Sequence, residues 1–187
     1  MPPRHFNTTL GALAIVTMLM VMPKAYAEEG EFSLAIGTGL VITTLDEGHT
    51  SRDRFGPLID LSVMWSLDDF WMLGARLQGA LQLEDIDTMG GQGHLTVETR
   101  YVIDALVWVP WAAVGFGVLV EAPASAQTGV NEGLAYDLTL HLGAGIDYRP
   151  ERDYALGMSV RYHFAPLSMP EKMGPIEVGI QGSFFFD

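Results

Sequence analysis

Apolar and polar residues alternate along most of the chain after position 31. In the last stretch Ile176 and Ile180 have one parity, whereas Glu177 and Gln181 have the other. A period of two places successive side chains on opposite faces of a strand, so each stretch predicts a strand with one apolar and one polar face. Eight such stretches are present, at 32–43, 58–67, 70–83, 94–104, 109–121, 136–147, 154–164 and 176–186.

A removable leader precedes this pattern and has to be set aside before the fold is considered. Arg4 and His5 form a short basic start, and residues 10–22 are apolar or small. The sequence Ala25-Tyr26-Ala27 then supplies the small-x-small pattern of a cleavage site. An uncleaved anchor is the alternative, but a spanning helix needs about 20 apolar residues and this run is shorter. We therefore expect a signal peptide at 1–27 and one β-barrel domain at 28–187.

The connections between the predicted strands favour a membrane barrel over a soluble β-sandwich, which would also alternate. Strands that cross a membrane must close on themselves, because backbone groups in lipid have no other hydrogen-bond partners. Outer-membrane barrels alternate short periplasmic turns with long outer loops. Long connections are predicted at 44–57, 84–93, 122–134 and 166–175, and short ones near 68–69, at 105–108 and at 149–153. The fold class expected is all-β, an eight-stranded antiparallel up-and-down transmembrane barrel with both termini in the periplasm.

Aromatic residues gather near the short connections. Tryptophan and tyrosine are enriched where a membrane protein crosses from hydrocarbon to water, so such a cluster predicts an aromatic girdle at one interface. A soluble sandwich gives no reason for this clustering. The girdle is expected to contain Trp65, Trp71, Trp108, Trp111, Tyr148 and Tyr154.

On these strands and aromatics the chain resembles the small eight-stranded outer-membrane barrel families, such as OmpA, OmpX and OmpW. The resemblance covers nearly the whole mature chain and rests on the pattern, not on a specific motif. It implies an outer-membrane location, contact with outer-membrane lipid, and recognition of the last strand by the barrel-assembly machinery. Ile180, Phe184 and Phe186 resemble that assembly signal. Two departures from the usual pattern are Gly182, which interrupts the series, and Asp187, which follows it.

The polar faces of the strands predict what fills the barrel. Eight strands enclose a space just wide enough for side chains, and charges taken out of water need partners. Pairing across the turn near 68–69 puts Arg76 opposite or diagonal to Asp60. In the same way Arg161 is expected near His141 or Thr139. Gln78 and Gln181 complete a predicted network of Asp60, Arg76, Glu98, Arg100, Asp137, His141, Arg161, His163 and Glu177.

Small residues are expected to make room for this network. Glu98 and Arg100 should face the small residues Ala113, Gly115 and Gly117 of the next strand.

Composition and charge exclude several classes of function. The chain has a formal charge of −13, and loss of the leader with Arg4 and Lys24 makes it about −15. A nucleic-acid partner is not expected, because phosphates attract basic surfaces. There is no cysteine for a disulfide or a lipid anchor. The acidic residues Glu84, Asp85 and Asp87 have no recognised metal spacing, so we expect no cofactor and no metal.

Enzyme chemistry is the competing class, because some eight-stranded barrels modify lipids. Such enzymes need a nucleophile, a base and an orienting carboxylate that lipid can reach. His141, His163 and Ser159 all have the inward parity, whereas His49 and His94 are predicted in or beside loops. We therefore expect a non-enzymatic barrel with a structural or surface-interaction role. A narrow channel for small or hydrophobic solutes is the first alternative, and a lipid-modifying enzyme is the second.

Overall fold

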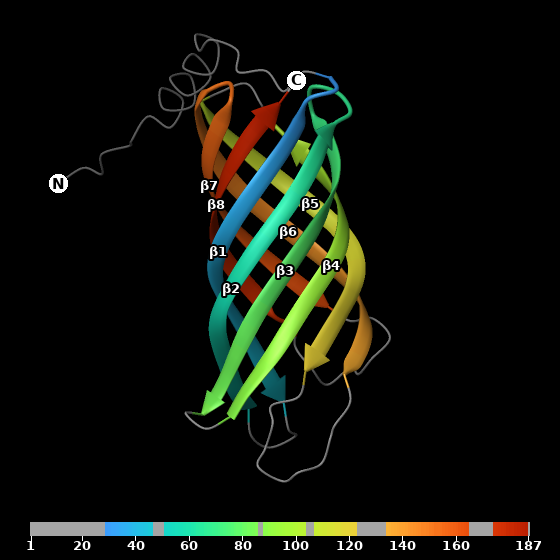
Figure 1. Ribbon diagram of the computed structural model, residues 1–187, viewed down its shortest axis with the longest axis vertical. Helices are drawn as coiled ribbons and strands as arrows, with labels where there is room; N and C mark the ends of the chain where they lie inside the picture. Colours follow the sequence, from blue (N-terminus) through green and yellow to red (C-terminus); the bar gives the residue numbers. More distant parts are fainter. Residues whose placement is uncertain are drawn as a thin grey trace, which may run out of the picture.

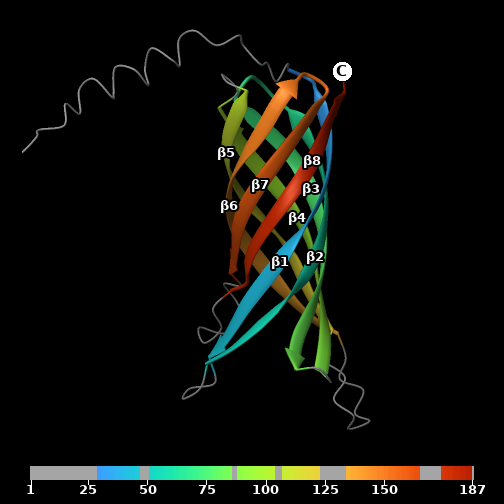
Figure 2. The same ribbon diagram turned by 90° about the vertical axis from the view of Figure 1, so that its left-hand side faces the viewer.

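The computed structural model is a closed barrel of antiparallel strands, tilted relative to the long axis (Figures 1 and 2). The structure describes residues 29–46, 51–85, 88–103, 107–122, 134–164 and 174–186. Within these ranges each strand pairs with its neighbours in sequence, and the last strand pairs with the first. The strands are β1 (Phe32–Asp46), β2 (Ser51–Ser66), β3 (Trp71–Asp85), β4 (Thr88–Val102), β5 (Trp108–Ala122), β6 (Ala135–Glu151), β7 (Tyr154–Phe164) and β8 (Ile176–Phe186).

Closure is made by β1 and β8, which run in register from Phe32 opposite Phe186 to Ile42 opposite Ile176. A closed barrel has no free strand edge, so the backbone groups of the strands are satisfied by one another. We call the end where β1 begins and β8 finishes the termini end, and the opposite end the loop end (Figure 1). The predicted eight-stranded up-and-down barrel is confirmed.

Two of the predicted long connections are mostly strand. β1 extends to Asp46 and β2 begins at Ser51, so 44–57 is not a long loop. β3 extends to Asp85 and β4 begins at Thr88, so 84–93 is not one either. The predicted strict alternation of long and short connections is therefore wrong at these two places. Residues 90–93 include three glycines, but their backbone continues to pair with β3, so they are part of the strand.

The other connections differ less from expectation, where the structure describes them. The turn predicted at 149–153 is confined to residues 152–153, because β6 continues to Glu151. Residues 47–50, 123–133 and 165–173 lie outside the described residues, and so does the predicted leader at 1–27. The described part of the chain contains no helix of the length and hydropathy that crossing a membrane requires.

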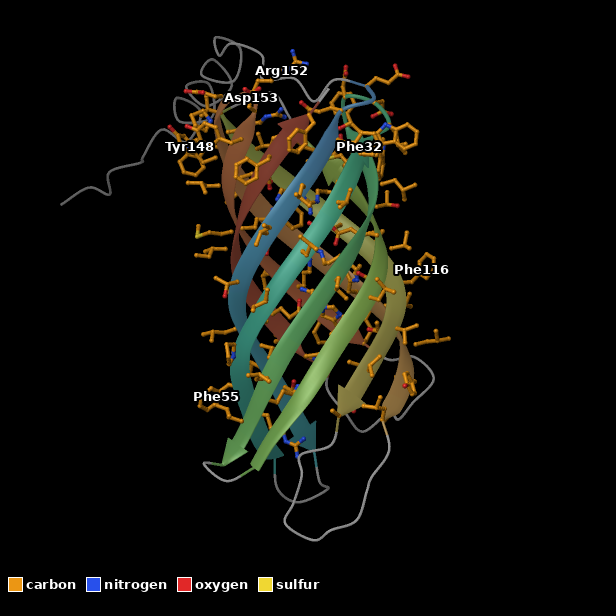
Figure 3. The ribbon with its side chains drawn as sticks, in the orientation of Figure 1. Phe32, Phe55, Phe116, Tyr148, Arg152 and Asp153 are labelled. Carbon is orange, nitrogen blue, oxygen red and sulfur yellow. The ribbon has the colours of Figure 1, made fainter. Side chains whose placement is uncertain are left out.

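Large apolar side chains point outward from the barrel. Phe116 is 62% exposed and projects from the wall at mid-height (Figure 3). Trp71, Ile59 and Leu156 are exposed in the same way. The interior is the reverse, since its buried residues are mainly polar or charged. This inside-out arrangement suits a protein whose outer solvent is hydrocarbon.

Five of the six aromatic residues predicted for the girdle lie on the outer surface at the termini end. Trp65, Trp71, Trp108, Tyr148 and Tyr154 are all exposed on the outer surface. Neighbouring rings pack against one another, with centroids 4.8 Å apart for Trp108 and Tyr148. Figure 3 shows Phe32 and Tyr148 at this same end.

Trp111 is the exception, and its assignment to the girdle is wrong. Trp111 is only 4% exposed, whereas Trp108 on the same strand is 53% exposed. The two residues are three positions apart, and an odd separation puts side chains on opposite faces of a strand. Nearness to a turn therefore misplaced a residue that parity assigns to the interior.

Candidate functional site in the barrel interior

Glu98 of β4 is the centre of the interior network. Its side chain has no exposed surface. Oε2 of Glu98 accepts a hydrogen bond from Arg76 Nε at 3.1 Å, and Oε1 accepts one from Arg100 Nη2 at 2.9 Å. His141 Nε2 is 3.1 Å from Oε2, and Arg161 Nε is 3.6 Å from it. One carboxylate thus joins side chains from β3, β4, β6 and β7.

Arg76 extends this network to β2 through an ion pair with Asp60. In the sheet register Asp60 is opposite Gln78, and Arg76 is opposite Ser62, so the pair is diagonal, which is one of the two predicted arrangements. The network of Asp60 and Glu98 with three arginines is almost completely buried. Because buried charges are costly unless they are paired, each member depends on the others staying in place.

Glycines on β5 and β6 make room for these long side chains. Gly115 is opposite Glu98 and Ala113 is opposite Arg100, which confirms the predicted facing of charged and small residues. A β-carbon at Gly115 would overlap the ring of His141. Gly143 leaves space in the same way for Arg161.

A second cluster lies beside the first and consists of imidazoles with one carboxylate. The ring centroids of His94 and His163 are 4.5 Å apart, and those of His141 and His163 are 5.3 Å apart. Glu177 of β8 lies against this cluster, with Oε2 at 3.1 Å from His163 Nε2. The side chain of Gln78 donates a hydrogen bond to the same oxygen at 2.8 Å.

His94 was predicted beside a loop, and this prediction is wrong. Its side chain is buried in the interior, because β4 begins at Thr88 and already carries the inward parity at position 94. Pairing across the turn at 149–153 predicts His163 near Asp137 or Thr139. His163 lies opposite His141 in the register, so it is diagonal to Thr139. Asp137 is half-buried and lies opposite Leu119, nearer the loop end.

An apolar layer lies in the interior on the other side of Glu98, toward the termini end. Sequence reasoning missed this layer, although the inward parity of Ser62 and Ser66 also assigns Met64 to the interior. Arg100 and Arg161 lie over the ring of Trp111, with their guanidinium carbons 4.2 Å and 5.1 Å from its centroid. The layer consists of Met64, Met72, Val102, Val109, Trp111 and Ala113.

A further ion pair lies at the termini end. Arg149 Nη2 is 2.9 Å from Glu31 Oε1, and the guanidinium of Arg149 lies over the ring of Phe185 at 3.7 Å. Arg149 was predicted in a turn, but it is the inward residue near the end of β6. Deeper in, Gln181 donates to Asp147 at 3.3 Å.

Two cavities lie between interior side chains of the described residues, and their volumes are about 20 Å³ and about 10 Å³. A cavity of this size holds about one water molecule. The larger recess of about 610 Å³ is on the outer wall, where it is lined by outward side chains such as Trp108, Leu156 and Met158. It therefore opens toward lipid and is not a passage through the barrel.

Two other groups of residues have the expected positions. Ile180, Phe184 and Phe186, the predicted assembly signal, lie on the outer face of β8. Ser159, His141 and His163 point inward, and the Ser159 hydroxyl accepts a hydrogen bond from Arg161 at 2.9 Å. A serine in this position is shielded from lipid by the barrel wall.

No protein-family model matches the sequence, and no curated protein matches it either. Solved structures do match. The neisserial surface protein A has a TM-score of 0.66 and 12% identity, covering 84% of this chain and 100% of its own. The outer membrane protein OprG from Pseudomonas aeruginosa has a TM-score of 0.60 and 13% identity, covering 88% and 99%.

A third match is Ail, the attachment invasion locus protein of Yersinia pestis. Its TM-score is 0.56 at 15% identity, and the alignment covers 84% of this chain and 99% of Ail. At these identities the similarity concerns the fold. The chain has the eight-stranded barrel fold of small outer-membrane proteins.

Proposed function

We propose that the chain is a non-enzymatic outer-membrane protein whose barrel is closed by its own side chains and serves as a rigid support for structural or surface contacts. The observation that carries this proposal is the filling of the interior by two successive layers. The network around Glu98 is one layer, and the apolar side chains around Trp111 are the other. The loop end would then carry whatever contacts the protein makes.

The two layers oppose passage for different physical reasons. An ion that entered the Glu98 layer would have to displace arginines that are already paired with carboxylates. An ion that entered the apolar layer would lose its hydration without gaining partners, which costs several kcal/mol or more in a medium of low polarity. A narrow channel, the first alternative, would need both layers to move.

The outer surface supports the membrane location. The exposed aliphatic and aromatic side chains need a hydrocarbon solvent, and the girdle at the termini end fits a lipid–water interface. The longest intervals between strands, from β5 to β6 and from β7 to β8, are at the loop end, whereas the connections at 67–70 and 152–153 at the termini end are short, so we place the termini end in the periplasm. Two structural neighbours are named as a surface protein and an attachment invasion locus protein, which makes surface attachment the first role to examine.

Conductance across planar lipid bilayers tests the closed interior. We expect no steady single-channel steps from the wild-type chain. Trp111→Ala should raise the leak, because it removes the largest side chain of the apolar layer. Trp108→Ala is the matched control, since it removes an outward tryptophan from the same strand and should leave the interior closed. Steady steps from the wild type would overturn the proposal in favour of a channel.

The enzyme alternative has its own test. Incubation of the wild-type chain with lipid A should release no fatty acid, because the inward serine and histidines are out of reach of lipid. Release that is lost in Ser159→Ala would contradict the non-enzymatic assignment.

A further inference from the structure

We propose that the barrel interior binds one divalent transition-metal ion, of the class that Zn²⁺ represents, on His94, His163 and Glu177. These residues come from β4, β7 and β8, and all three are buried. One ligand atom from each lies within 4.8 Å of the other two. In the order of strands around the barrel β4 is opposite β8, so the ion would join two facing walls.

Three of the four ring nitrogens of these two buried histidines have no hydrogen-bond partner among the described residues. Neither ring nitrogen of His163 has a hydrogen-bond partner, and Nδ1 of His94 has none. Nε2 of His163 is 3.1 Å from Glu177 Oε2, but the geometry is not that of a hydrogen bond. Buried polar atoms are nearly always paired, and an ion is one of the standard explanations when they are not. A metal ion would accept lone pairs from both imidazoles and from the carboxylate at once.

Two imidazoles and one carboxylate are a donor set that suits zinc. Zinc binds histidine nitrogen and carboxylate oxygen at about 2.0–2.2 Å, and three protein ligands are enough when a further donor fills the last position. Ligand atoms around a tetrahedral ion are then about 3.3 Å apart. His163 Nε2 and Glu177 Oε2 are already 3.1 Å apart. The ligand atoms of all three residues lie within 4.8 Å of one another, so the widest separation has to shorten by at most about 1.5 Å. Calcium and magnesium prefer oxygen ligands, and two of the three donors here are nitrogens.

The surrounding residues hold Glu177 toward the histidines. The Gln78 amide donates to the carboxylate at 2.8 Å, which makes Gln78 a positioning residue. Arg161 is directly opposite Glu177 in the register, but its Nε is turned to Glu98 at 3.6 Å and its guanidinium lies near Trp111. The carboxylate of Glu177 is thereby left facing the imidazoles.

Access to this site would be from the loop end. Between the site and that end lie Thr43, Gln82 and Gln92, which are neutral and hydrogen-bonded to one another, and Gln92 also contacts His94. On the other side the path is blocked by the Glu98 network and by the apolar layer.

Calorimetric titration of the full chain in detergent micelles with ZnCl₂ tests this site. We expect one Zn²⁺ per chain and no binding of Ca²⁺ or Mg²⁺ at the same concentrations. His94→Gln and His163→Gln should abolish the one-site binding. Gln78→Leu should weaken it about 10–100-fold, as loss of a residue that orients a ligand usually does. His49→Gln is the control for adventitious binding by a histidine that is not among the three proposed ligands, and it should bind like the wild type.

Co²⁺ provides a readout that does not depend on any variant. A tetrahedral site with nitrogen ligands gives bound Co²⁺ a strong visible absorption, which Zn²⁺ should displace at one equivalent. Wild-type chain without this band, or one-site zinc binding that persists in both histidine variants, would overturn the proposal. Circular dichroism shows whether each variant keeps its β-sheet. The conductance test above is independent, so failure of metal binding leaves the closed interior standing.

Discussion

The outer wall and the interior of this barrel are built from the same strands but follow different rules. On β4, Leu95 and Val97 face outward, whereas Thr96 between them and Glu98 after them are buried inside. An outward side chain has only to be apolar, because its contacts with lipid tails have no direction. An inward side chain needs a particular partner at a particular distance, as Glu98 does with Arg76 and Arg100. The outward side chains therefore suit the barrel to a hydrocarbon solvent, and the inward side chains determine which specific contacts hold its interior together.

The largest loss of unfolding free energy is expected when the central carboxylate, Glu98, is neutralised. Glu98→Gln leaves Arg76, Arg100 and Arg161 short of a buried anion, and breaking a buried pair costs about 3–5 kcal/mol of unfolding free energy. We expect the upper part of this range, because three cations share the one carboxylate. Urea unfolding of the barrel in lipid vesicles measures the change.

Glu151→Gln is the control for this change, since Glu151 is exposed at the end of β6. Its substitution should change the free energy of unfolding by no more than about 0.5 kcal/mol. Equal effects of the two variants would mean that the interior charges are not coupled.

The cost of a charged side chain on the outer wall should depend on how deep in the bilayer it lies. Phe116 is at mid-height and Phe32 is at the termini end (Figure 3). Arginine facing lipid costs about 2–4 kcal/mol at the midplane of a bilayer and about 0–1 kcal/mol near its interfaces. Phe116→Arg should therefore lower the free energy of unfolding more than Phe32→Arg does. If Phe32→Arg proves the more damaging, the wall does not face hydrocarbon in the way proposed here.

The wall was more predictable from the sequence than the interior. Alternation of apolar and polar residues was sufficient for the eight strands, for the outward aromatics and for the diagonal pair of Asp60 and Arg76. The alternation was not followed at two places. The long connection predicted at 84–93 put His94 beside a loop, and nearness to a turn put Trp111 on the outer face, but both side chains are buried inside.

Some contacts in the interior could not be predicted from the alternation of residues along the strands. Parity says that His94, His163 and Glu177 point inward once the strand boundaries are known. It does not say that β4 faces β7 and β8 at the same height, because that depends on how far successive strands are staggered around the closed barrel. The separations of these three residues in sequence are therefore uninformative, and only the closed structure brings their ligand atoms within 4.8 Å.

The smallest change in stability is expected from adding one methyl group, either in the interior at Gly115 or on the outer face at Gly79. At Gly115 an added β-carbon would overlap the His141 ring and approach the carbonyl oxygen of Val97, which is backbone and cannot swing aside. Overpacking of this kind costs about 1–3 kcal/mol, so Gly115→Ala should lower the urea midpoint. Gly79 faces outward and has no atom within 4 Å of the position that a β-carbon would take. Gly79→Ala should leave the midpoint unchanged or raise it slightly, because alanine restricts the unfolded chain. Both substitutions are glycine to alanine within a strand. A difference between them therefore reports the packing around the added methyl group and not the strand propensity of alanine. A loss of stability at Gly79 as large as at Gly115 would show that strand backbone, and not the crowded interior, sets the cost.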